Sequence, residues 1–100
     1  MTELLSWQVE ASTLRLQGEL DRETLLALWQ QRETLSSAID TIDVSALDRV
    51  DSAGLALLVH LRQILQQQGK TPLFTGVTDK LLSLITLYNL QQIIVSPAES

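Results

Sequence analysis

The sequence contains no cysteine, a single histidine (His60) and no apolar run longer than the seven residues from Ala53 to Val59. The lack of cysteine excludes disulfide bonds and thiolate metal sites, and it favours a reducing compartment. The short apolar run is far below the roughly 18 residues that a membrane-spanning helix needs. The chain carries Glu3 and no basic residue before its first apolar pair, so we expect no secretory signal there.

Positive charge is also scarce, with seven Lys and Arg residues against twelve Asp and Glu residues and a net charge of −5. Nucleic acids and anionic membrane surfaces are polyanions, so both are disfavoured as direct partners. One hundred residues of 45% apolar content predict a single domain over residues 1–100 that buries about 65% of its extended-chain surface. We expect this domain to be cytoplasmic, with a frayed tail at about 96–100.

The patterns of catalytic and metal-binding sites are missing as well. His60 lies eight residues after Ser52 on one predicted helix, about 12 Å along the axis and too far for the contact that a serine nucleophile needs. The aspartates lack the spacing of a calcium loop and are explained by turns and helix caps: Asp40, Asp43, Asp48 and Asp51. No glycine-rich phosphate loop occurs. The sequence therefore predicts no enzyme, no metal site and no cofactor.

The remaining residues predict alternating strands and helices. Alternating or continuous apolar segments indicate strands at residues 5–10, 13–18, 41–44, 72–75 and 93–95. Helical spacing indicates helices at 21–36, 53–67 and 79–88, the first capped by Asp21. The last helix should bury Leu81, Leu84, Ile85 and Tyr88 and end at Asn89. An opening hairpin followed by this alternation predicts an α/β (α+β) fold with a mixed sheet, and a right-handed crossover from strand 41–44 to a parallel strand 72–75.

The stretch from Asp51 to Leu55 is expected to start the central helix. A Ser or Asp ahead of an apolar segment is a usual helix start, because its side-chain oxygen accepts from an N–H that the first turn leaves unpaired. Since strand 41–44 lies just upstream, Ser52 should sit where a strand end leads into a helix, in an accessible and electropositive position. Gly54 is expected to let the helix begin close to the sheet.

The central helix carries apolar residues on two sides. At about 100° per residue, one arc forms the predicted core stripe: Leu57, Leu58, Leu61, Ile64 and Leu65. Leu55 and Val59 fall in the opposite sector with Ser52, Ala56 and Gln63. Single exposed leucines are common on protein surfaces, but two large apolar residues beside an exposed serine favour a partner-docking face.

Three motifs, in this order and spacing, resemble the STAS domain family: Gly18-Glu19-Leu20-Asp21, Val50-Asp51-Ser52-Ala53-Gly54-Leu55 and Leu87-Tyr88-Asn89-Leu90. That family includes the anti-sigma-factor antagonists and the cytoplasmic tails of sulfate transporters. The resemblance covers nearly the whole chain. It looks strongest to one branch, the small STAS subunits of the bacterial phospholipid-transport ABC complexes (the Mla system) that maintain outer-membrane lipid asymmetry.

The resemblance implies a single STAS-type domain with a mixed four- to five-stranded sheet and helices mainly on one face. It also implies a non-catalytic regulatory and assembly subunit that binds and stabilises the ATPase subunit of a permease-containing membrane complex. Such a subunit would be cytoplasmic, held at the inner face of the inner membrane through its partner and not inserted itself. In this branch the residue matching Ser52 lies at the ATPase contact, which makes the docking face Ser52, Leu55, Ala56, Val59 and Gln63.

The antagonist branch implies an alternative function. There, phosphorylation of the residue matching Ser52 releases the partner, so this chain would be an anti-sigma-factor antagonist switched at Ser52. Ala53 replaces a second serine that is often found in the antagonists, which weakens this alternative. Ser52 is therefore a candidate switch residue, and a plain helix cap is the competing interpretation.

Overall fold

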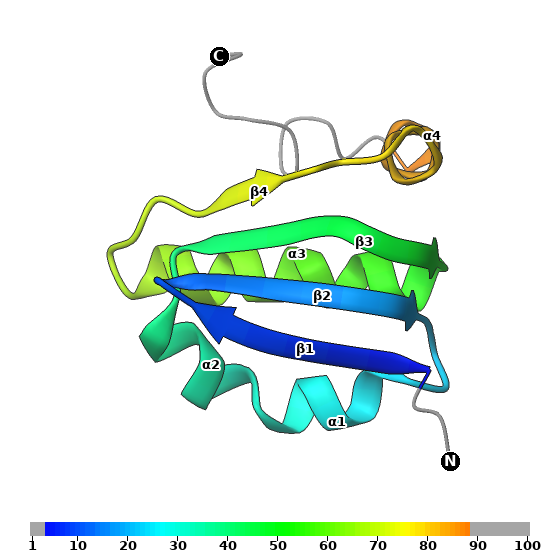
Figure 1. The fold of residues 1–100 in the computed structure, drawn as a ribbon. Coiled ribbons are helices and arrows are strands. Elements are labelled where there is room, and N and C mark those ends of the chain that lie inside the picture. Colours follow the sequence, from blue (N-terminus) through cyan, green and yellow to red (C-terminus); the bar gives the residue numbers. More distant parts are fainter. Residues whose placement is uncertain (1–3, 89–100) are drawn as a thin grey trace.

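A mixed sheet with the strand order β1-β2-β3-β4 forms one layer of the computed structural model, which describes residues 4–88 (Figure 1). Its strands are β1 (Leu5–Glu10), β2 (Thr13–Leu20), β3 (Thr41–Val50) and β4 (Leu73–Thr75). β1 pairs antiparallel with β2, while the pairs β2–β3 and β3–β4 are parallel. The predicted hairpin is confirmed. Its two turn residues, Ala11 and Ser12, both have positive φ (49° and 69°), as the twist of a two-residue hairpin requires.

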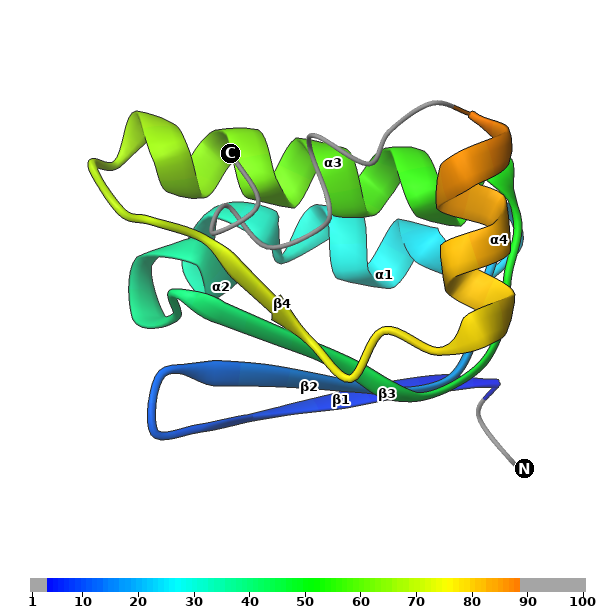
Figure 2. The same cartoon turned by 90° about the horizontal axis from the view of Figure 1, so that it is seen from above.

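Four helices cover one side of this sheet in the described part of the chain (Figure 2). They are α1 (Leu25–Gln30), α2 (Arg32–Ala38), α3 (Ser52–Gln67) and α4 (Asp79–Leu87). The crossover from β3 through α3 to β4 joins parallel strands and is right-handed, as predicted (Figures 1 and 2). The opposite sheet face is polar: Arg15 Nε, for example, lies 3.5 Å from Asp43 Oδ2. The predicted fold class is confirmed.

The hydrophobic core lies between the sheet and the helices. The sheet contributes side chains that point toward the helices, among them Leu14, Leu16, Ile42 and Val44, all fully buried. The predicted stripe of α3 is confirmed at its buried members Leu57, Leu58, Leu61 and Leu65, while Ile64 is half-buried. Burying one such side chain fully stabilises the fold by about 1.5–3 kcal/mol, so this stripe holds α3 against the sheet.

The predicted helix over residues 21–36 is wrong, because two shorter helices occupy this region. The N–H of Gln31 donates to the carbonyl of Leu28 (3.1 Å), a tighter turn than an α-helix makes, and it ends α1. The Arg32 side chain then folds back, with Nη1 donating to the Trp29 carbonyl at 2.9 Å. Asp21 lies four residues before Leu25 and stabilises the turn ahead of the helix, while Thr24 is the N-cap position of α1.

Two strands are longer than the sequence indicated. β2 continues from residue 18 to Leu20, and β3 continues from residue 44 to Val50. Register shifts between these two strands break the regular alternation that would have revealed the extensions. In α4, Leu81 and Ile85 are buried as predicted, but Tyr88 follows the helix end and is exposed. The predicted strand at 93–95, the helix end at Asn89 and the tail at 96–100 lie outside the described residues.

Candidate functional site

The start of α3 lies directly after the end of β3, as predicted, but its N-cap is Asp51. The Asp51 backbone is extended (φ −101°, ψ −175°), and its Oδ1 accepts a hydrogen bond from the Gly54 N–H at 2.8 Å. Ser52 is therefore the first residue of the helix, and its side chain is exposed. The interpretation of Ser52 as the helix cap is wrong, because the preceding carboxylate already takes that hydrogen bond.

Asp51 also contacts the segment that follows β2. Its Oδ2 accepts from the backbone N–H of Arg22 at 3.1 Å, and its own N–H donates to the Leu20 carbonyl at 3.3 Å. Burial has the largest single influence on this carboxyl and raises its pKa. The net pKa nevertheless lies below the ordinary value, because backbone N–H groups, including those of Gly54 and Arg22, stabilise the carboxylate. The positive charge of Arg49 lowers the pKa further.

Gly54 brings the first turn of α3 against the sheet, as predicted. A Cβ placed on this residue would lie 2.2 Å from the Leu20 carbonyl oxygen and 2.9 Å from its carbon. No side chain fits at that distance without moving either the helix or the strand. The glycine therefore sets how closely α3 can approach the carboxyl end of β2.

Three of the five residues predicted to form a docking face on α3 lie at the surface. Ser52, Ala56 and Gln63 are exposed, and Val59 is half-buried with its inner side packed against the core. The placement of Leu55 on this face is wrong, since only 2% of that residue is exposed.

Leu55 belongs to the hydrophobic core, to which α4 also contributes. α4 lies beside the first turns of α3 (Figures 1 and 2), and Leu55 is buried in the same core as Leu81 and Ile85 of α4. The core stripe of α3 is therefore wider at its start than a helix packed on a sheet alone would need. A charged substitution of Leu55 would disrupt the fold, so it cannot serve as a test of docking.

A cluster that the sequence did not predict extends this face toward α1 and α2. His60 is exposed on α3, and its ring meets that of Trp29 edge to face with centroids 5.3 Å apart. The Arg32 guanidinium lies over the Trp29 ring, 3.9 Å from its centroid. These side chains line an open groove of about 590 Å³ that also includes Gln63. His60 is thus a surface residue, as predicted, but periodicity alone gave no sign of its aromatic partner.

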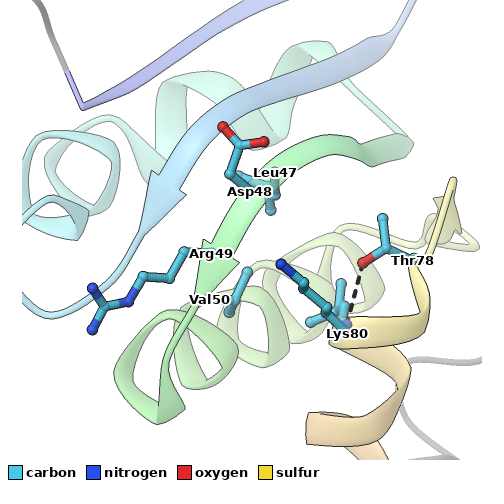
Figure 3. A pocket seen from close by; sticks show the side chains of 7 residues that line it. Leu47, Asp48, Arg49, Val50, Thr78 and Lys80 are labelled. Atoms are coloured by element: carbon cyan, nitrogen blue, oxygen red, sulfur yellow. Dashed lines mark hydrogen bonds between the residues drawn. The ribbon is translucent and has the colours of Figure 1, made fainter.

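A smaller cleft of about 280 Å³ lies between the carboxyl end of β3 and the start of α4 (Figure 3). The Thr78 hydroxyl caps α4 by accepting from the Leu81 N–H at 3.2 Å. Lys80 lies at the cleft, whereas the Arg49 side chain points away from Lys80 (Figure 3). Asp48 and Arg49 belong to the extended strand β3.

Within residues 4–88, the structure brings together no group of three or more His, Asp or Glu side chains that could hold a metal ion. Over the same residues, no helix combines the length and the apolar character that crossing a membrane requires.

Comparison with known proteins decides the family. The family described as "Mlab, STAS domain" matches residues 4–96. The chain belongs to the MlaB-type STAS domain family. It is 48% identical to the intermembrane phospholipid transport system binding protein MlaB of Escherichia coli K12 over 90 residues, which span 90% of this chain and 93% of that protein.

Other relatives agree with this assignment. The protein of the same name from Haemophilus influenzae is 36% identical, over 87% of this chain and 92% of its own. Among solved structures, an anti-sigma factor antagonist from Mycobacterium paratuberculosis superposes with a TM-score of 0.66 at 21% identity, covering 91% of this chain and 81% of the other. At that identity the likeness to the antagonist concerns the fold alone.

Proposed function

We propose that this MlaB-type STAS domain is a non-catalytic component of an intermembrane phospholipid transport system, in which it binds and stabilises the ATPase subunit. The 48% identity to Escherichia coli MlaB over 90% of the chain supports the transport role. The antagonist alternative rests on a likeness at 21% identity, so we place it second. ATP hydrolysis is assigned to the partner, and the chain is held at the inner face of the inner membrane through that partner.

The observation that carries the docking proposal is the exposed face of α3 formed by Ser52, Ala56, Val59 and Gln63, which we call the α3 face. It combines a small apolar residue with a half-buried valine and uncharged polar groups. The interior of a protein interface is typically depleted of charge in this way. The chain as a whole has a net charge of −5, so an uncharged strip this long is a distinctive part of its surface.

Ala56→Glu tests the proposal without disturbing the fold. Ala56 is exposed in the interior of α3, and glutamate forms helices almost as well as alanine, so stability should change by less than about 0.5 kcal/mol. A charge buried without a partner in an interface should weaken binding by about 2 kcal/mol or more. The measurement is the affinity of the purified chain for the purified ATPase subunit by calorimetry, with melting temperatures alongside.

Gln17→Glu provides the matched control. It adds the same charge at an exposed position of β2, on the sheet face opposite the helices. It should bind the ATPase like the wild type. Unchanged affinity of a folded Ala56→Glu chain would remove the α3 face from the interface, and no binding by the wild type would remove the proposed function.

Ser52 is the proposed switch position of the same face. A phosphate adds about −1.5 to −2 charges, which the start of a helix tolerates but a docked apolar surface does not. We therefore expect Ser52→Asp to weaken ATPase binding. Ser52→Ala should retain binding and cost little stability, because Asp51 and not Ser52 caps α3. Equal affinity of both variants would show that charge at this position does not control docking.

A further inference from the structure

The Asp51 carboxylate joins two segments that are distant in sequence. One carboxylate oxygen accepts from Gly54 N–H in the first turn of α3 (2.8 Å), and the other accepts from Arg22 N–H in the turn that leads into α1 (3.1 Å). The two donors are separated by 32 residues, from 22 to 54. A helix cap needs only one oxygen, so the contact with Arg22 is additional to capping.

The consequence is that the turn ahead of α1 is tied to the first turn of α3, and the two helices run alongside each other in the same direction (Figure 2). At the other end of α1, Trp29 meets His60 of α3 with ring centroids 5.3 Å apart. The two helices are therefore joined near both ends of α1 and pack as neighbours. Their exposed residues include the α3 face and Leu26 of α1.

Leu26 is the strongest sign that this surface extends over α1. Leu26 is 58% exposed, which places it among the most exposed large apolar residues of the described part of the chain. It lies one residue after Leu25, which packs partly against the core, so Leu26 points outward from α1 and not into the sheet. An exposed leucine on the helix that neighbours α3 offers an apolar contact of the kind found in protein interfaces.

We propose that Asp51 is the positioning residue of the docking surface: it fixes α1 and α3 as one surface, on which Leu26 adds a contact for the ATPase subunit. This inference rests on the proposed function for its partner. A surface made of two helices can bind tightly only if their relative placement is settled before binding, because ordering them during association lowers the affinity. Asp51 provides that order without touching the partner.

Asp51→Asn and Asp51→Ser test the role of the second oxygen. Asn and Ser cap a helix about as well as Asp, so the contact with Gly54 is retained while the one with Arg22 is lost. We expect each variant to bind the purified ATPase subunit roughly tenfold more weakly, with the melting temperature lower by only about 4–8 °C. Amide hydrogen exchange should speed up in residues 22–30 and stay slow in the middle of α3.

The donor can be removed independently. Arg22→Pro deletes the backbone N–H, whereas Arg22→Ala retains it and removes only the exposed side chain. Arg22→Pro should therefore reproduce the affinity loss of Asp51→Asn, Arg22→Ala should not, and the double variant should be no weaker than either single one. Leu26→Ser should also weaken binding roughly tenfold, while Leu73→Ser, at an exposed leucine of β4, should not.

Lys70→Met is the control for lost stability alone, since the Lys70 side chain donates to carbonyls in the last turn of α2 and just after it, away from the start of α3. It should lower the melting temperature to a similar extent and leave the affinity unchanged. Wild-type affinity of Asp51→Asn and Asp51→Ser, or unchanged exchange in residues 22–30, would overturn the positioning role while leaving the proposed function intact. If the wild-type chain itself does not bind the ATPase subunit, the proposed function and this inference fall together.

Discussion

Replacing Gly54 by alanine sets two opposite effects against each other. Alanine favours a helix over glycine by about 0.8–1.0 kcal/mol, which alone would stabilise α3. The added Cβ would lie 2.2 Å from the Leu20 carbonyl oxygen, however, roughly 1 Å closer than the ~3.3 Å at which carbon and a carbonyl oxygen ordinarily meet. Leu20 is fully buried and its carbonyl accepts from the Asp51 N–H, so the strand cannot move aside without losing contacts.

Overpacking of this kind costs about 1–3 kcal/mol and occasionally more. Because the obstacle is backbone, the upper part of that range applies, and we expect a net loss of about 2 kcal/mol in the free energy of unfolding. Urea denaturation followed by circular dichroism measures it, with the midpoint shifted and the slope unchanged. Ala53→Gly in the same turn reports helix propensity alone and should cost no more than about 1 kcal/mol. A Gly54→Ala chain as stable as the wild type would refute the close approach of α3 to β2.

Two further predictions concern stability. Lys70 Nζ donates to the carbonyls of Ser36 (2.6 Å) and Ile39 (2.7 Å) at the end of α2. Lys70→Met should therefore lower the free energy of unfolding, measured by urea titration, by about 1–3 kcal/mol. An unchanged free energy of unfolding would mean that water replaces the lysine. The pKa values of Asp43 and Asp51 lie below the ordinary value. Their stabilisation is therefore complete above about pH 4, the carboxyl pKa in the unfolded chain, and is lost as the pH falls from there toward the lower folded pKa values. Melting temperatures between pH 6 and pH 2 should decline mainly below pH 4, and Asp51→Asn should flatten that decline.

Much of the fold could be predicted because its signals are local. The two-residue turn between β1 and β2, the apolar stripe of α3 and the start of α4 each follow from neighbouring residues. The exposed side of α3 was predicted in part by the same reasoning: Ser52, Ala56 and Gln63 lie outward on α3, because helical periodicity fixes their direction relative to the buried stripe.

The remaining features could not be predicted from residues adjacent in sequence, because each depends on a contact between segments that are distant in sequence. Leu55 is buried in a core to which α4 also contributes Leu81 and Ile85, and a periodicity argument for one helix on one sheet leaves α4 out. Asp51 and not Ser52 caps α3, because β3 continues to Val50 and the Asp51 N–H donates to the Leu20 carbonyl. In this position the Asp51 carboxylate accepts from the N–H groups of Gly54 and Arg22. The sequence by itself determined which segments become strands and helices and which face of α3 turns inward. Only the tertiary structure decided how wide that buried face is and which segments meet at Asp51, since hydrogen bonds and packing between distant residues exist only after the layers have come together.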